Sequence, residues 1–351
     1  MLALLIMFLM TSYSLCKIPG KVTICSIGKN VEKAIPNSIR TIEGIGGLFE
    51  DYRVFIYENN SVDNSAAMLK EWADKNDKVT VISEWLSNEE LKKHSIATCW
   101  DLAPFRVCIL AMARNIVLKL AMSHEFDEYE YYIMTEMDFA IPWNYRAIED
   151  IFHKYNFEWD AILANGVTKN DLSLTYDTYT YRDHQHPFGP EVIGEQWWFN
   201  IPKTRVTKNS MVPVISAFGG LGIYKRKSIK GCYYSGVVNE EMNIYMENFF
   251  KIYKNSDRYA NAFDQYQKSL SKLNKIYVLE DIDESKYKNN PDCFNYNVGI
   301  KLKKNSEVVW RFQSGITNYP VLCDHHPFHA AMANRGHDKF YVYSELRPIY
   351  G

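Results

Sequence analysis

The chain has 351 residues, of which 47% are hydrophobic and 15% aromatic, and its formal net charge is −2. A chain of this size can bury a large core, and its length is compatible with a single α/β domain. It contains no long basic block, which argues against nucleic acid as a partner.

Residues 1–16 form an apolar run that is shorter than the roughly 20 residues needed to span a bilayer. The run is similar to the apolar region of a signal peptide but lacks a basic leader, and a clipped membrane anchor is the alternative. We therefore expect residues 1–18 to be a signal-like or anchor segment. This predicts a protein of the secretory pathway or one associated with a membrane, and a cytoplasmic protein if the segment is not a signal.

The first part of the chain alternates between β-branched runs and segments with helical spacing. Turn-forming residues separate them, and Pro36 lies near the start of a helical segment, where proline is tolerated. We predict strands at 21–28, 52–58 and 78–83, with helices at 31–48 and 64–75. This β-α-β-α-β alternation predicts an α/β fold with a mostly parallel central sheet flanked by helices.

The clearest helix is predicted at 104–122, because apolar residues recur there at spacings of three and four. The face that we expect to be buried comprises Phe105, Cys108, Ile109, Met112, Ile116 and Leu120. After it we predict a strand at 129–135, a helix from Pro142 to about Tyr155 and a strand at 159–163.

The second half of the chain is less regular. Residues 165–211 are polar, aromatic and rich in histidine without a sustained period, which is typical of a functional insert. Strand character returns at 214–224 around a Gly-Gly break. Residues 239–275 are helical in part, and 281–307 are polar and rich in turn residues.

The run YEYYIMTEMDF, residues 129–139, is a hydrophobic strand that ends in Glu136-x-Asp138. Open α/β sheets bind ligands at the carboxyl ends of their strands, and carboxylates suit Mg²⁺ or Mn²⁺. Side chains two residues apart point to the same side of a strand only while the strand stays extended. We expect the chain to bend near Met137, and this bend would determine how the two carboxylates approach one ion. We assign Asp138 to the metal and Glu136 to a ribose or a metal-bound water.

Two further segments carry candidate binding residues in the first half. Glu58 and Asp63, after the second predicted strand, can accept hydrogen bonds from a ribose or base; alternatively Asp63 or Ser61 only caps the next helix. Arg114 offers a planar cation to a diphosphate or to a nearby acid. A surface or ion-paired role is the commoner one for a single arginine.

The densest cluster of polar ligands is CDHHPFH, residues 323–329. Histidine can complete a Mn²⁺ site that carboxylates begin, whereas Asp324 can instead act as a general base on an acceptor hydroxyl. A structural role for the histidines is an equal alternative. Gly219 and Gly220 allow close approach of a ligand, and with Trp197 they suggest a sugar-acceptor platform; a backbone bend is the alternative.

Seven motifs follow one another in the order VFIYENNSVDNS, MARN, YYIMTEMDF, WDAILANGV, YDTYTYRD, SAFGGLGIY and CDHHPFH. On these motifs the chain resembles glycosyltransferases with the GT-A fold, and most closely the group that includes the fungal capsule α-1,3-mannosyltransferases. The similarity runs from about Val22 to about Lys339.

The resemblance implies a GT-A, Rossmann-like domain over residues 19–351, with a nucleotide-binding half at 19–140 and an acceptor-binding half at 141–351. It implies a nucleotide-sugar donor such as GDP-mannose, Mn²⁺ or Mg²⁺, and a hydroxyl acceptor on a glycan or glycoconjugate. It places the metal at Asp138, with Glu136 beside it and His325 as the third ligand, and places Asp177 and Arg182 along the sugar or acceptor pocket.

The chain departs from the usual motif of that group by carrying glutamate at position 136, and His326 adjoins His325. An inverting enzyme would need a base, for which Asp324 is the candidate, whereas a retaining enzyme would not. A zinc hydrolase that uses the His/Asp clusters at 183–186 and 324–329 is the competing enzyme class, although neither cluster has H-E-x-x-H spacing. A non-catalytic sugar-binding module is the third alternative.

Overall fold

The computed structural model describes residues 17–87, 90–91, 106–139, 141–155, 157–175, 177, 179–187, 210–236, 239–253, 255–260, 263–264, 278–279, 302–303 and 323–350. Residues 1–16 of the predicted N-terminal signal or anchor segment lie outside these ranges, as does Trp197. Among the helices within them, none combines the length and apolar character needed to cross a bilayer.

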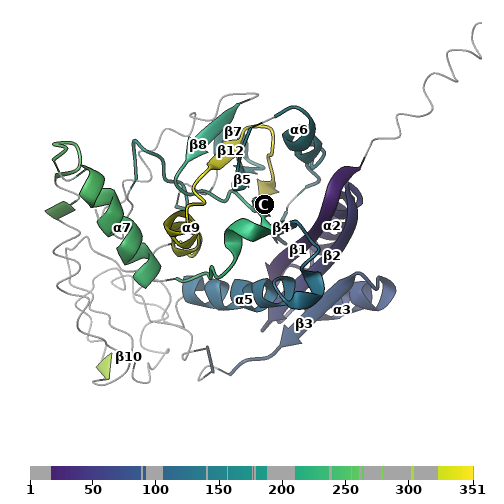
Figure 1. Ribbon diagram of the computed structural model, residues 1–351. Helices are drawn as coiled ribbons and strands as arrows, with labels where there is room; N and C mark the ends of the chain where they lie inside the picture. Colours follow the sequence, from purple (N-terminus) through teal and green to yellow (C-terminus); the bar gives the residue numbers. More distant parts are fainter. Residues whose placement is uncertain are drawn as a thin grey trace, which may run out of the picture.

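An eight-stranded sheet forms the centre of the molecule (Figure 1). Its strands, in spatial order, are β3 (Val79–Glu84), β2 (Phe49–Asn59), β1 (Ile18–Gly28), β4 (Tyr131–Glu136), β9 (Leu221–Lys225), β5 (Ala161–Ala164), β12 (Phe340–Tyr343) and β8 (Met211–Val214). Strands β9 and β8 run opposite to the rest, and the other pairings are parallel. The predicted α/β fold with a mostly parallel central sheet is confirmed.

Helices cover both faces of this sheet. Side chains from α2 (Ile35–Gly47), α3 (Ser65–Lys75) and α6 (Ala147–His153) join one core cluster, and those from α5 (Arg106–Ala121) and α9 (His325–Asn334) join the other. Strand β1 feeds both clusters in alternation, with Cys25 and Ile27 on the α5 side and Ile24 on the α2 side. The period of two along a strand thus produces a sheet that is buried on both faces.

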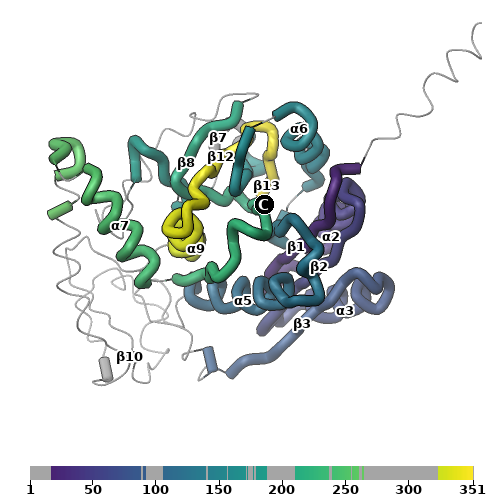
Figure 2. Tube along the Cα trace, viewed as in Figure 1, coloured from purple at the N-terminus to yellow at the C-terminus, as the bar shows by residue number. Residues whose placement is uncertain are grey.

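Outside the main sheet, β6 (Val167–Thr168) and β7 (Asp171–Thr175) form a hairpin that pairs with β13 (Ile349–Tyr350), and β10 (Val278–Leu279) pairs with β11 (Leu302–Lys303). Short 3₁₀ turns span His124–Phe126 and Arg226–Ile229. Helix α7 (Glu240–Tyr253) lies beside α9, although the two are far apart in the sequence (Figure 2). Met246 and Phe249 of α7 share a small core with Ala330 of α9.

The first five predicted elements and the strand before the acid pair occur where the sequence places them. The predicted face of the long helix is only partly correct: Cys108 is buried, and Phe105 lies outside the described residues. Helix α5 buries Ala111, Val117 and Leu118 against the sheet, whereas Met112 and Ile116 are only partly buried at the margin of the same core. Small alanine side chains let the helix approach the strands closely, and this rotates the larger apolar stripe away from the centre of the contact.

Three predictions for the second half also need correction. The helix predicted from Pro142 to Tyr155 forms only over Ala147–His153. The single strand predicted at 214–224 is two strands: β8 lies at the edge of the sheet, and β9 lies between β4 and β5. Part of the predicted irregular insert, 165–211, is the ordered hairpin of β6 and β7.

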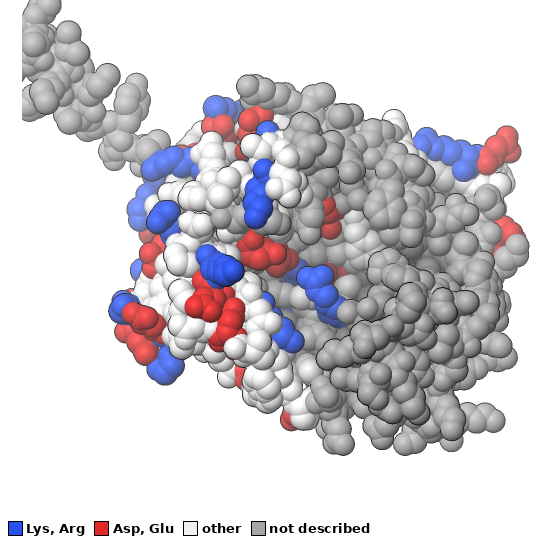
Figure 3. All heavy atoms as spheres, turned by 180° about the vertical axis from the view of Figure 1, so that it is seen from behind, with Lys and Arg blue, Asp and Glu red and all other residues white. Residues whose placement is uncertain are grey.

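Charges of both signs are distributed over the described surface. Seen from behind, lysine and arginine side chains are interspersed with aspartate and glutamate (Figure 3). Some are neighbours on one helix, such as Lys70 with Asp74 on α3. The described part of this face therefore carries mixed charge without a dominant sign. Exposed pairs of this kind contribute little to the stability of a fold.

The turn between β8 and β9 explains why one strand becomes two. Gly219 and Gly220 have φ angles of +58° and +94°, a region that other residues rarely adopt. A Cβ atom on Gly219 would lie 2.3 Å from the carbonyl oxygen of Ala164, and one on Gly220 would lie 2.1 Å from the Tyr350 hydroxyl oxygen. Protein atoms therefore fill the space beside both glycines, which favours the alternative of a backbone bend over a ligand approach.

We predict that Gly219→Ala destabilises the protein by at least about 1–3 kcal/mol, the usual cost of a non-glycine residue held in a strained backbone conformation. Gly47→Ala is the matched control, because a Cβ there meets nothing within 4 Å at the end of α2. The control should leave the free energy of unfolding unchanged or raise it by up to about 1 kcal/mol. Urea unfolding of both variants measures the difference, and equal midpoints would contradict the assignment.

Candidate functional site

The acid pair lies where β4 ends. The strand stops at Glu136 and the chain bends at Met137, as predicted. Two hydrogen bonds hold this bend: the Ser38 hydroxyl donates to the Met137 carbonyl oxygen (2.8 Å), and the Glu136 N–H donates to the Gly220 carbonyl oxygen (3.0 Å). The Asp138 side chain is exposed, so a carboxylate is available at the carboxyl edge of the sheet.

A buried arginine joins this edge to the start of α9. Arg114, on α5, is only 3% exposed, and its guanidinium forms ion pairs with both Glu136 and Asp324. The guanidinium carbon also lies 5.4 Å from the centre of the Phe218 ring. The ion-paired alternative for Arg114 is therefore the one that the structure displays, and the pairs connect α5 and β4 to α9, which is distant from both in sequence.

The site carries an excess of negative charge. Among the described residues, the carboxylates of Glu136, Asp138 and Asp324 lie within electrostatic range of the buried guanidinium of Arg114, and Arg106 attracts Asp138 more strongly than Arg114 does. Burial raises the pKa of the Glu136 carboxyl to about 7; Arg114 opposes this rise, and the neighbouring Asp138 and Asp324 add to it. A further cation at this edge would relieve the repulsion between the acids.

His325, the first residue of α9, has two unused nitrogen atoms in the interior. It is 1% exposed, and neither Nδ1 nor Nε2 has a hydrogen-bond partner among the described residues. Its ring stacks on Phe218 with centroids 3.9 Å apart and meets the edge of Tyr234 at 5.2 Å. Burial and the charge of Arg114 hold the pKa of His325 well below its usual value, so the imidazole is neutral, the form that binds metals.

The two neighbouring histidines are already engaged. The Nε2 atom of His326 lies 2.9 Å from the Thr180 carbonyl oxygen, and its Nδ1 lies 3.5 Å from the guanidinium of Arg182. His329 contacts the Ser216 and Tyr224 hydroxyls through its two nitrogens, at 2.8 and 3.1 Å. Of the two adjacent histidines, His325 is thus the one whose nitrogens are available to a ligand.

These residues provide some, but not all, of the ligands that a divalent cation needs. Asp138 offers an exposed oxygen and His325 an unpartnered nitrogen, whereas Glu136 is held by Arg114. In the portion of the chain with described coordinates, no three His, Cys, Asp or Glu side chains are close enough together to hold a metal ion. The predicted trio of Glu136, Asp138 and His325 is therefore not assembled as a three-ligand site.

Glu58 and Asp63 hold the backbone around the turn that follows β2. The buried Glu58 carboxylate accepts hydrogen bonds from the Ser61 N–H (2.9 Å) and the Ser83 hydroxyl. Asp63 accepts from the N–H groups of Ser65 (3.0 Å) and Glu32 (3.2 Å). Asp63 thus serves the start of α3, as the alternative expected, and a contact of either acid with a nucleotide stays a prediction.

Asp177 and Arg182, expected along the sugar or acceptor pocket, lie near the glycine turn and α9. The Asp177 carboxylate accepts a hydrogen bond from the Gly219 N–H (3.4 Å). The buried Arg182 guanidinium donates to the carbonyl oxygens of Tyr179 (3.0 Å) and Tyr181 (2.8 Å). Both residues stabilise the local backbone, and Arg182 also lines a cavity between α7 and α9.

Sequence reasoning missed the aromatic packing that orients His325. The ring of Tyr234 stacks on Phe328 with centroids 4.2 Å apart and presents its edge to His325. The Tyr234 N–H and carbonyl groups are in turn fixed by the Asn115 side chain at 2.8 and 2.9 Å. Tyr234 stands in a segment without periodicity, so no sequence signal identifies it.

The chain was compared with known proteins. No family model matches it, and no curated protein matches it. Solved structures with some similarity include S. aureus TarS 1-349 (13% identity, TM-score 0.32, 61% of this chain and 50% of that one). They also include the mannosyltransferase PcManGT from Pyrobaculum calidifontis in complex with GDP-Man and Mn²⁺ (14% identity, TM-score 0.33, 64% and 50%).

A third is glucosyl-3-phosphoglycerate synthase from Mycobacterium tuberculosis in complex with Mn²⁺, UDP and phosphoglyceric acid (9% identity, TM-score 0.33, 68% and 66%). This chain spans about half the length of the TarS and PcManGT chains. Because these TM-scores are below 0.5, the similarities do not establish the function of this chain.

We predict that Arg114→Met lowers the free energy of unfolding by about 3–5 kcal/mol, because it leaves the buried Asp324 carboxylate without its counter-ion. Arg40→Met, at an exposed position of α2, is the control and should change stability by no more than about 0.5 kcal/mol. Adding Asp324→Asn to Arg114→Met should recover part of the loss. Strictly additive effects in a urea-unfolding double-mutant cycle would contradict the ion pair.

Proposed function

We propose that the protein is a metal-dependent glycosyltransferase that moves a sugar from a nucleotide-sugar donor to a hydroxyl acceptor on a glycan or glycoconjugate. The observation that supports the proposal is that three features interact electrostatically with Arg114: the exposed Asp138 after the bend in β4, the paired carboxylates of Glu136 and Asp324, and the imidazole of His325, which has no partner among the described residues. A divalent cation and a diphosphate together suit such a site.

The donor class follows from the resemblance in sequence motifs, which points to GDP-mannose. Mn²⁺ or Mg²⁺ would be held by Asp138 and His325 and, when bound, would offset the charge that develops on the leaving diphosphate. Glu136 lies beside Asp138 and is oriented by Arg114. This leaves Glu136 for a ribose hydroxyl or a metal-bound water, as its position in the motif suggests.

We propose a positioning role for Asp324 in place of the general-base role. Its carboxylate is 2% exposed, and one oxygen is paired with Arg114. A base must reach the proton that it removes, and an aspartate held in this way by a buried guanidinium does not reach an acceptor. Through Asp324, Arg114 instead fixes the first turn of α9 and with it the ring of His325.

The proposal is tested by thermal unfolding of the full chain with UDP, GDP or CMP, each with Mn²⁺ or with a chelator. A ligand at 100 times its dissociation constant stabilises the native state by about 2.7 kcal/mol, so one nucleotide should raise the melting temperature only with Mn²⁺. We predict that Asp138→Ala and His325→Phe abolish this shift. Phenylalanine retains the stacking on Phe218 and removes both nitrogens.

The matched controls are Asp74→Ala and His124→Ala, which alter exposed side chains on α3 and in the 3₁₀ turn. Both should retain the full shift. An unchanged shift in Asp138→Ala would remove that residue from the metal site. A response to Zn²⁺ alone, with none to any nucleotide, would favour the hydrolase, and sugar binding without metal dependence or turnover would favour the binding module.

A further inference from the structure

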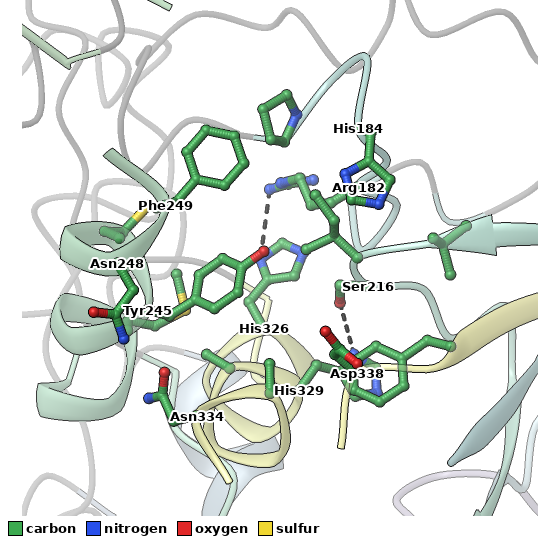
Figure 4. Close-up of a pocket in the computed structure, with 18 of the residues that line it drawn as sticks. Arg182, His184, Ser216, Tyr245, Asn248, Phe249, His326, His329, Asn334 and Asp338 are labelled. Carbon is green, nitrogen blue, oxygen red and sulfur yellow. Dashed lines mark hydrogen bonds between the residues drawn. The ribbon is translucent and has the colours of Figure 1, made fainter. Parts of the chain in front are cut away.

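A cavity of about 410 Å³ lies between α7 and α9, apart from the acid pair (Figure 4). Its volume is within the range of about 300–1,000 Å³ typical of small-molecule sites. The two helices are far apart in sequence and pack directly against each other at one end. The cavity is therefore built into the tertiary structure and does not belong to a single local motif.

One wall of the cavity is largely apolar and aromatic. Helix α7 contributes Met246, Phe249, Ile252 and Tyr245, and Figure 4 shows Tyr245 and Phe249 projecting from it toward the side of the cavity that holds Arg182 and His326. Ile252 is 74% exposed, so the apolar wall continues to the protein surface. Flat aromatic faces at a site that opens to water suit the C–H face of a sugar ring.

The opposite wall is polar and rigid. His326 and His329 line it from α9, and each has its ring fixed by hydrogen bonds to neighbouring groups. At the rim the Asp338 carboxylate is exposed, and the Tyr245 hydroxyl forms no hydrogen bond with any residue in the described ranges. Because the ring nitrogens of both histidines are already engaged, a ligand with several hydroxyl groups would find its hydrogen-bonding partners in the Tyr245 hydroxyl and the Asp338 carboxylate.

Helix α9 is the wall shared by the cavity and the candidate metal site. His325 faces Phe218 and Tyr234, whereas the next residue, His326, faces Arg182 and the cavity. Adjacent Cα atoms are about 3.8 Å apart, so one helical end presents the two sites on neighbouring faces.

We propose that the cavity between α7 and α9 binds a neutral sugar unit of the glycan acceptor, with Tyr245 and Phe249 on the ring face and polar side chains at its edges. This inference rests on the proposed function, because it assigns the acceptor of that reaction. A sugar ring has an apolar C–H face and hydroxyl groups at its edges, which match the aromatic wall and the polar side chains of this cavity. A purely apolar ligand would leave the Tyr245 hydroxyl without a partner.

The test uses saturation-transfer NMR of the full chain with millimolar methyl glycosides of mannose, glucose, galactose and xylose. We expect at least one glycoside to bind the wild-type protein and to lose its signal in Ala333→Trp, which fills the cavity from α9. Lys251→Trp places the same side chain at an exposed position of α7 outside the cavity and should bind normally. Tyr245→Phe should weaken binding about threefold to tenfold, as for the loss of one hydrogen bond.

The same variants are then titrated with nucleotide and Mn²⁺ by thermal unfolding. If the nucleotide shift persists while no glycoside binds the wild-type protein, or while Ala333→Trp binds as well as the wild type, the acceptor site is refuted and the transferase proposal stands. If glycosides bind through the cavity and no nucleotide shifts the melting temperature, the sugar site stands and the transferase proposal fails. Equal loss of binding in Lys251→Trp would also overturn the assignment.

Discussion

The arrangement of the candidate site depends on one buried cation, the guanidinium of Arg114. It lies between Glu136 at the end of β4 and Asp324 at the start of α9, and it comes from α5. A charge buried to this extent is tolerated only when it is paired, and the same holds for the Asp324 carboxylate. Arg114 and Asp324 therefore each need the other as a counter-ion. Pairing the guanidinium with both carboxylates fixes the end of β4, α5 and the start of α9 relative to one another.

The histidines of helix α9, whose start is held by this ion pair, have different roles. Its three histidines differ in their surroundings: the ring nitrogens of His325 have no partner among the described residues, while His326 and His329 use theirs to bind neighbouring segments. Two histidines thus act as structural cross-links that hold the helix in place. The third is kept neutral and unpartnered, which is costly for a buried polar ring unless a ligand uses it.

Local patterns were enough to predict the alternating strands and helices of the first half and the bend after Glu136, because side-chain period and turn chemistry act within a few residues. They failed where distant partners decide. The buried face of α5 depends on Ala111 approaching the sheet, and β9 leaves β8 to enter between β4 and β5. Likewise, the choice between His325 and His326 rests on Thr180, 146 residues away, which no spacing within the motif reveals.

The insertion of β12 between β5 and β8 has a consequence for biosynthesis. Arg114 and Asp324 are 210 residues apart, and at about 5–20 residues per second a ribosome needs about 10–40 s to make the intervening chain. Throughout that interval the guanidinium lacks one of its counter-ions. From the completion of β5 until β12 is made, β5 lacks its parallel neighbour and presents an open edge. Unpaired edges recruit other strands, so the nascent chain passes through a period of exposure to aggregation that closes only after Tyr343 has been added.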